Sequence, residues 1–291
     1  MKVGTGSYTY ELVENFAKLP EGEAFGLVSR VTTDSRNRLY VFQRKDPAVL
    51  VFDHDGNFLH AWGNGQFKRA HGFKIAGDAA YVTDQVDCVA MIYTLEGKLV
   101  RQLGNRGEHS DTGCEDWHNL PLRAAGPFNH PTEMMPGPSG DLYVTDGYRN
   151  SRVHRFTKDG ELIQSWGQPG KTAPGDFHLP HSLAISPDGT IHVCDRANAR
   201  VQHFTPDGQY IGMWTGMGGP NDIARDAAGN FYLCEQASEV GKPAISVRDG
   251  DGAVLARWEV DPVHGMGIDA AGNIYAGLTR KSRVDKYVRM A

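Results

Sequence analysis

Histidines recur at one position of a pattern that repeats along the chain. In four copies a histidine stands where the first strand of the copy would begin, and these residues are His71, His130, His181 and His264. Three of them belong to the second, fourth and sixth copies, which would be alternate sheets in a radial arrangement. Three imidazoles from alternate sheets could form a metal site with positions left open for water or substrate. Zinc is the first expectation, with Fe(II), Mn(II) and Co(II) as alternatives.

A simpler role is open to each of these histidines. The imidazole of a residue at a strand start can bond a backbone carbonyl group, and for one histidine alone that is the better interpretation. The spacing of His71, His181 and His264 across alternate copies favours the metal. His130 breaks this symmetry, and we assign it to substrate binding, with a plain repeat residue as the alternative.

A second group of candidates follows the acidic residue that ends the second strand of a copy. Tyr148 comes after Asp146, Arg196 comes after Asp195, and Arg44 has the matching place in the first copy. Strand ends at one end of the channel would bring these side chains toward the histidines. A dication and two guanidinium groups favour the phenolate form of a tyrosine, which could then act as a base. Arginines also bind carboxylates through two hydrogen bonds, although a salt bridge with a neighbouring sheet is an equally good interpretation of each.

The repeat that positions these residues consists of short apolar runs separated by turns. The runs alternate apolar and polar residues and break at D-G, G-N or D-x-x-G-x sequences, which accept the positive φ of tight hairpins. Six copies occur, and each predicts a four-stranded meander. One such sheet cannot bury both of its faces, whereas six arranged radially can. The sequence therefore predicts an all-β, six-bladed β-propeller, with residues 1–291 as a single domain.

Two segments depart from the repeat. The sixth copy is one strand short, and residues 8–16 alternate like an outer strand, so we expect them to complete the sixth blade and close the ring. A ragged tail is the alternative. Residues 105–128 form a polar insert between the second and third copies, and long loops are usually functional or disordered. Trp117, His118 and Phe128 favour an ordered flap over one face.

Composition argues against several classes of function. The chain has 291 residues, 22% of them charged, and a formal net charge of -5, so it lacks the basic footprint of a nucleic-acid-binding protein. No stretch reaches the roughly 20 apolar residues of a membrane helix, and the first residues have no apolar signal-peptide core. Four cysteines without C-x-x-C spacing are typical of reduced thiols. We therefore expect a cytoplasmic protein with a small-molecule substrate, without nucleic-acid or membrane partners; the oligomeric state is left open.

Three motifs resemble the catalytic core of peptidyl-α-hydroxyglycine α-amidating lyase. They are D-G-Y-x-N-S-R at residues 146–152, F-x-x-P-H-S-L-A at residues 177–184 and D-R-x-N-x-R at residues 195–200. Their combination is specific, and a wider resemblance to NHL-repeat proteins extends from about residue 25 to residue 291. The resemblance implies a six-bladed propeller and a reaction that breaks the C–N bond of a carbinolamide, giving an amide and an aldehyde-acid.

The resemblance also implies roles for individual residues. One zinc ion would be held by His71, His181 and His264. Tyr148 would deprotonate the carbinol hydroxyl group, and two arginines, Arg44 and Arg196, would orient the substrate and support the developing charge. Within the tyrosine's motif, Asn150 and Arg152 are assigned with His130 to substrate binding.

The sequence departs from the family pattern at three places. Asn129 and Arg149 stand where the family has disulfide cysteines, in keeping with a reducing compartment. Gly265 replaces an acidic residue that the family links to structural calcium, which argues against calcium, and no methionine shortly precedes His264. We expect a lyase for a small carbinolamide-like substrate rather than peptide amidation. A lactonase-like, metal-dependent hydrolase and a non-catalytic NHL-repeat scaffold are the alternatives.

Overall fold

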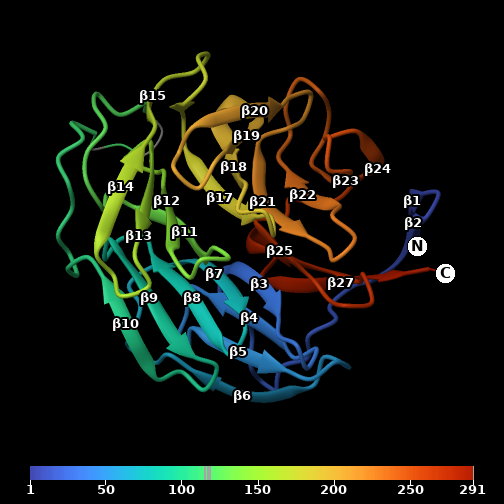
Figure 1. Cartoon of the computed structure of the whole chain (residues 1–291). Coiled ribbons are helices and arrows are strands. Elements are labelled where there is room, and N and C mark those ends of the chain that lie inside the picture. The colour runs from blue at the N-terminus through green and yellow to red at the C-terminus, as the bar shows by residue number, and fades with distance from the viewer. Residues whose placement is uncertain (115, 117–118, 291) are drawn as a thin grey trace. The chain divides into compact units, whose positions relative to one another are not determined.

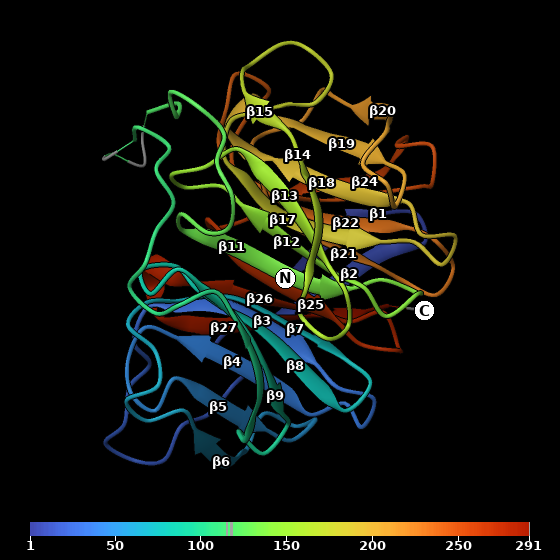
Figure 2. The ribbon, with the colours of Figure 1, turned by 60° about the vertical axis from the view of Figure 1, so that its left-hand side comes forward.

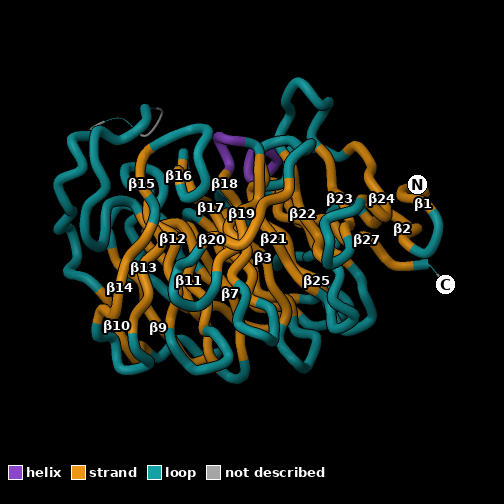
Figure 3. Tube along the Cα trace, turned by 45° about the horizontal axis from the view of Figure 1, so that its top comes forward, coloured by secondary structure: helices purple, strands orange, loops and turns teal. Residues whose placement is uncertain are grey.

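The computed structural model describes residues 1–114, 116 and 119–290. Two residues of the expected flap, Trp117 and His118, lie outside the described residues. The described chain consists of strands, turns and two short 3₁₀ turns, η1 (Arg196–Asn198) and η2 (Thr279–Lys281), as Figure 3 shows. Among the described residues, no helix has the length and apolar character needed to cross a membrane.

Six antiparallel sheets follow one another along the sequence, which confirms the expected all-β, six-bladed β-propeller fold (Figure 1). The chain, expected to be one domain, divides into two compact units, residues 1–70 with 221–291 and residues 71–220. Each unit accounts for three of the sheets. A two-stranded parallel ladder, β15 (Gln168–Pro169) with β16 (Asp176–Phe177), precedes the fourth sheet.

The continuous unit holds the second, third and fourth sheets. Each is a meander in which sequential strands pair, as Figure 2 shows for β11 to β14. The strands of the second sheet are β7 (Ala70–Ala76), β8 (Ala79–Asp84), β9 (Val89–Thr94) and β10 (Leu99–Leu103). Those of the third are β11 (Pro131–Pro136), β12 (Leu142–Asp146), β13 (Arg152–Phe156) and β14 (Leu162–Trp166). Those of the fourth are β17 (Pro180–Ile185), β18 (Ile191–Asp195), β19 (Arg200–Phe204) and β20 (Tyr210–Trp214).

The other unit holds the first, fifth and sixth sheets. The first sheet consists of β3 (Val28–Thr33), β4 (Leu39–Gln43), β5 (Val49–Phe52) and β6 (Phe58–Trp62). The fifth consists of β21 (Pro220–Arg225), β22 (Phe231–Glu235), β23 (Ala244–Arg248) and β24 (Val254–Glu259). The sixth combines β25 (Gly265–Ile268), β26 (Ile274–Leu278) and β27 (Arg283–Arg289) with two strands from the N-terminus, β1 (Lys2–Thr5) and β2 (Tyr8–Val13).

The N-terminal segment completes the sixth blade, as expected. β2 pairs with β27 in antiparallel register, with Tyr10 opposite Arg289. Tyr10 is fully buried, and its ring centre lies 5.1 Å from that of Trp258. This apolar contact holds β2 in place together with the backbone hydrogen bonds to β27. A further strand that the repeat did not predict is present, because β1 turns back at Gly6 and pairs with β2 as a fifth strand.

Middle strands lie between packed sheets, which explains why their burial does not alternate. All five residues of β12 and all five of β18 are buried, whereas β14 and β20 begin with exposed residues. Between the second and third sheets the core includes Ala90, Val144 and Phe156. Packing on both faces holds the ends of the middle strands β12 and β18, which the residues Tyr148 and Arg196 follow closely in the chain.

Two histidines contact each other on neighbouring strands of the fourth sheet, outside the candidate site. His192 and His203 are register partners, and their Nδ1 atoms are 2.8 Å apart. The ring of His192 also stacks on that of Trp214. Burial lowers the pKa of His203 to about 4. One proton fits between the two nitrogens, so a second proton would place like charges side by side.

We expect this pair to make the protein acid-sensitive. The folded chain takes up the His203 proton at a lower pH than the unfolded chain, so stability from this group is present above the unfolded value near 6.5 and is lost as the pH falls toward about 4. The loss corresponds to on the order of 3 kcal/mol. Urea unfolding at pH 7 and pH 4.5 measures it, and His203→Gln should reduce the difference.

The matched control is His54→Gln, because the side chain of His54 is 71% exposed. Carboxylates titrate in the same range, so the comparison is between the variants rather than between pH values alone. An unchanged acid loss in His203→Gln would show that the histidine pair is not the sensor.

Candidate functional site

The hydroxyl group of Tyr148 lies at the centre of a cluster in the continuous unit. It is 3.1 Å from Nε2 of His71 and 3.0 Å from Nε2 of His181. Nη1 of Arg196 donates to the same oxygen at 3.3 Å, and the guanidinium group lies 5.3 Å from the centre of the tyrosine ring. Both histidines are fully buried, and Tyr148 is 7% exposed. Four of the predicted site residues therefore meet within one unit.

The tautomer of His71 is set by a backbone carbonyl group. Nδ1 of His71 lies 2.8 Å from the carbonyl oxygen of Thr132. A carbonyl oxygen can only accept, so Nδ1 carries the proton and the lone pair of Nε2 faces Tyr148. Histidines that bind metals are typically held in this way by their other ring nitrogen. His71 can therefore bond the backbone carbonyl group through Nδ1 and bind a metal through Nε2 at the same time. The sequence alone presents these two roles as alternatives.

A tight turn after β12 carries Tyr148 to the histidines. A Cβ atom on Gly147 would lie 2.0 Å from the carbonyl oxygen of Pro180, so only glycine allows the turn to approach β17 this closely. The carboxylate of Asp146 anchors the turn, since it accepts hydrogen bonds from the Asn129 amide at 2.8 Å and from the Asn150 side chain at 2.9 Å.

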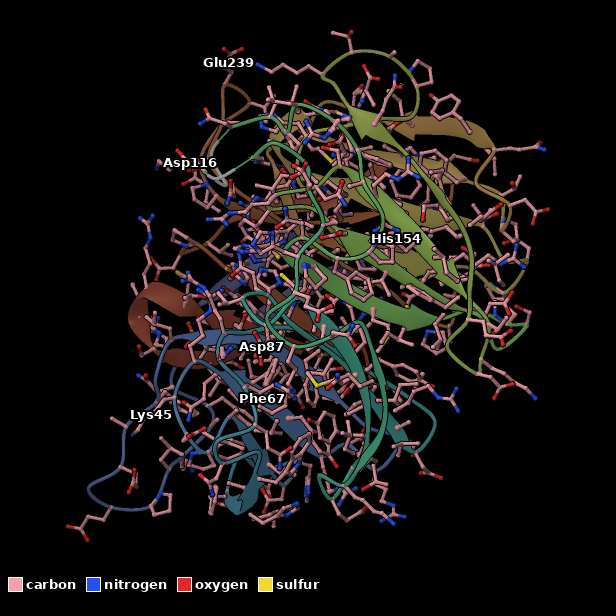
Figure 4. All side chains as sticks on the ribbon, turned by 90° about the vertical axis from the view of Figure 1, so that its left-hand side faces the viewer. Lys45, Phe67, Asp87, Asp116, His154 and Glu239 are labelled. Atoms are coloured by element: carbon pink, nitrogen blue, oxygen red, sulfur yellow. The ribbon has the colours of Figure 1, made fainter. Side chains whose placement is uncertain are left out.

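His154, labelled on the third sheet in Figure 4, supports the same carboxylate. Its Nε2 lies 3.2 Å from Asp146, and its Nδ1 lies 2.7 Å from the hydroxyl group of Ser165. His154 and Asp146 are both fully buried. This arrangement extends from the middle of the sheet to the base of the turn, and it makes His154 a structural residue rather than a member of the cluster around Tyr148.

Arg196 is positioned by the 3₁₀ turn η1 after β18. Its amide donates to the carbonyl oxygen of Leu179 at 3.2 Å. The preceding carboxylate, Asp195, accepts from the side chains of Asn198 and Arg200 at 2.8 Å each. Burial raises the pKa of Asp195 to about 6, while these hydrogen bonds act in the opposite direction. Asp195 therefore stabilises the turn η1, and Arg196, the next residue, contacts Tyr148.

Strand register corrects the place of His130 in the repeat. Pro131 pairs with Asp146 in the third sheet, and Pro180 pairs with Asp195 in the fourth. Thr132, rather than His130, is thus the equivalent of His181. His130 precedes its strand in a left-handed conformation with φ of 66°, and its carbonyl oxygen accepts from the Tyr148 amide at 3.4 Å. It supports the tyrosine turn through its backbone, and its assignment to substrate binding stays a prediction.

His264 lies in the other compact unit and makes the same kind of contact as His71. Its Nδ1 is 2.8 Å from the carbonyl oxygen of Ser29. The distance from Nδ1 of His71 to the carbonyl oxygen of Thr132 is also 2.8 Å. Ser29 and Thr132 have equivalent places in β3 and β11, since Val28 pairs with Gln43 as Pro131 pairs with Asp146. His264 is half-buried and lines a cavity of about 390 Å³ within its unit.

Three other predicted residues make structural contacts. Nε of Arg44 donates to the carbonyl oxygen of Ala70 at 3.1 Å. Asn150 is fully buried, and its side chain donates to Asp146 and accepts from the Ser151 amide. The guanidinium group of Arg152 donates to the carbonyl oxygens of Gly167 and Ser165. The structure does not bring Asn150 or Arg152 to the Tyr148 hydroxyl group, and their substrate-binding role stays a prediction.

The described part of the insert is fastened to the tyrosine turn. The hydroxyl group of Thr112 donates to the carbonyl oxygen of Arg149, and the Asn129 side chain donates to that of Ser110 at 2.9 Å. The Ala125 amide donates to the side chain of Asn150 at 3.3 Å. These contacts connect the insert to the segment that carries Tyr148, as an ordered flap would require.

Known proteins resemble this chain in sequence and in fold. The NHL repeat family model matches residues 177–204. NHL repeat-containing protein 3 of Mus musculus is 30% identical over 285 residues, which cover 89% of this chain and 78% of the relative. Peptidyl-α-hydroxyglycine α-amidating lyase 1 of Drosophila melanogaster is 28% identical over 203 residues, covering 64% of this chain and 36% of the relative. The solved structure of a streptogramin B lyase is similar in fold alone, with a TM-score of 0.66, 13% identity and coverage of 97% and 99%.

Proposed function

This chain belongs to the family of NHL repeat-containing protein 3, and we propose that it is a metal-dependent lyase that cleaves the C–N bond of a small carbinolamide-like substrate. One observation carries the proposal: Nε2 atoms of two buried histidines and a guanidinium group converge on the hydroxyl oxygen of Tyr148. Similarity over 64% of the chain to an amidating lyase supports the same class of reaction.

We propose that His71, His181 and His264 hold one divalent ion, with zinc as the first choice. The residues fit such an ion because imidazole nitrogens suit zinc, and because the Nδ1 contacts of His71 and His264 leave both Nε2 atoms as acceptors. A bound ion would supply a Lewis acid for the hydroxyl oxygen of the substrate.

The chain's own residues would then move one proton. Tyr148 takes the proton from the carbinol hydroxyl group, the C–O bond becomes a carbonyl, and the C–N bond breaks with its electron pair on nitrogen. Tyr148 returns the proton to that nitrogen, so the products are an amide and an aldehyde. Arg196 donates to the tyrosine oxygen and supports the negative charge that passes between tyrosine and substrate. Arg44 is proposed to bind the carboxylate of an acidic substrate.

Product analysis in ¹⁸O-labelled water tests the type of reaction. The zinc-loaded protein is incubated with an N-acyl-α-hydroxyglycine, and a lyase should yield an unlabelled primary amide and an aldehyde-acid. A hydrolase would instead place the label in a carboxylate, from this compound or from a lactone offered in parallel. A chain that binds no transition metal and turns over neither compound would be a non-catalytic scaffold.

A further inference from the structure

A fully buried arginine lies beside the histidine of the sixth blade. Arg30 is in the middle of β3, and 0% of its surface is exposed. Its Nη1 donates to the carbonyl oxygen of His264 at 2.6 Å, and its Nη2 donates to that of Asn221 at 3.4 Å. Its Nε is 3.8 Å from the carboxylate of Asp222, which is also 0% exposed. All four residues belong to the same compact unit.

The carboxylate of Asp222 contacts the strand that follows His264, β25. Asp222 accepts a hydrogen bond from the Met266 amide at 2.9 Å, two residues after His264. The side chain of Asn221 donates to the carbonyl oxygen of Val263 at 2.8 Å, one residue before it. The backbone that carries the histidine is therefore held on both sides by side chains from β3 and β21.

Gly265 makes room for the guanidinium side chain. A Cβ atom at Gly265 would lie 2.6 Å from Cδ of Arg30 and 2.8 Å from the carbonyl oxygen of Ser29. Any larger residue would therefore displace either Arg30 or the carbonyl group that accepts from Nδ1 of His264. The arginine and the glycine form a matched pair.

Such a buried ion pair calls for a reason beyond stability. Apolar residues of similar volume often stabilise a core as well as a buried ion pair does, because two charges must lose their water. What an arginine adds is a fixed set of donors with a defined direction. Here those donors point at the carbonyl oxygens of His264 and of Asn221, which lies on β21.

We propose that the pair Arg30–Asp222 is a positioning clamp for His264. It fixes the carbonyl group of His264 and the amide of Met266. Nδ1 of the ring lies 2.8 Å from the carbonyl oxygen of Ser29 and 3.3 Å from Nη1 of Arg30, and the shorter contact, to an oxygen that can only accept, keeps the proton on Nδ1 and leaves Nε2 for the metal. The inference rests on the proposed function, in which His264 is a metal ligand. Arg30 and Asp222 act through the histidine and do not themselves touch the substrate.

Zinc affinity of Arg30→Gln, measured by competition with a chelator, tests the clamp. Residues that orient metal ligands typically contribute 10- to 100-fold to affinity, and we expect a loss of that size. The matched control is Arg248→Gln, which removes another buried arginine paired with a carboxylate, Glu235, in the same unit. The control should bind zinc within about twofold of wild type. Wild-type affinity in Arg30→Gln would overturn the inference.

Long-range ¹H–¹⁵N NMR of the metal-free protein separates the clamp from the proposed function. In the wild type, His264 should be a single Nδ1–H tautomer, and in Arg30→Gln it should become a mixture. If the wild type binds no zinc, the proposed function fails while this comparison still decides the clamp. Arg30→Lys, which keeps the charge but loses the planar fork, serves if Arg30→Gln does not fold. A single unchanged tautomer in the folded variant would refute the clamp.

Discussion

Replacing Tyr148 with phenylalanine should reduce kcat/KM for a carbinolamide by 10²- to 10⁴-fold, the usual contribution of a positioned base. The change removes one oxygen atom, which is the atom that both histidines and Arg196 approach. The ring is 7% exposed and packs edge-on against both imidazoles, so the fold should tolerate the change. Initial rates measure the loss of activity, and the metal content of the same preparation checks that the site is intact.

The control for Tyr148→Phe is Tyr143→Phe in the neighbouring strand β12. The Tyr143 ring is also buried, and its hydroxyl group contacts only a carbonyl oxygen, that of Pro206, at 3.5 Å in the described chain. It should retain activity. Turnover of Tyr148→Phe within about threefold of wild type would show that another group acts as the base.

Removing the histidines should abolish metal binding. His71 and His181 are buried with their Nε2 atoms facing one oxygen, and a double change to alanine would leave at most one of three proposed ligands. We expect the metal content to fall from about one ion per chain to near zero, and activity to fall with it. Elemental analysis of folded, dialysed protein measures the loss.

A histidine near the site supplies the comparison. His178 is half-buried, only three residues before His181, and its backbone amide rather than its ring bonds to Asp195. His178→Ala should keep its metal, since the amide remains. Retention of a stoichiometric metal by the His71→Ala/His181→Ala protein would place the metal elsewhere or disprove the site.

Much of the fold could be predicted because the chain repeats itself. Turn residues occur at fixed places in all six copies, so strand number and order follow from local chemistry. The extra strand β1 could not be predicted in this way, because it has no counterpart in the other copies and its pairing depends on Gly6 reversing the chain.

The candidate site could be predicted in part for a different reason. Tyr148, His181 and Arg196 stand in motifs of uncommon residues, so their types alone indicated chemistry. His130 was misplaced in the repeat because aligning the copies by their histidines shifts the third copy by two residues, whereas the pairing of Pro131 with Asp146 and of Pro180 with Asp195 makes Thr132 the equivalent of His181. Arg30 was missed because burial of a guanidinium group depends on distant partners, Asp222 and His264, which local sequence does not reveal. Its only local signal is an arginine inside a strand of buried residues.

The pairing of β2 with β27 affects the order in which the sheets can form during synthesis. The unit of residues 71–220 is continuous, so its three sheets need no strand from the two ends of the sequence, and it contains His71, Tyr148 and His181. The other unit joins opposite ends of the sequence, and closing so long a loop carries an entropic cost. The sheet with His264 must therefore wait until β27 has been synthesised. Metal capture by all three histidines would then follow the pairing of β2 with β27.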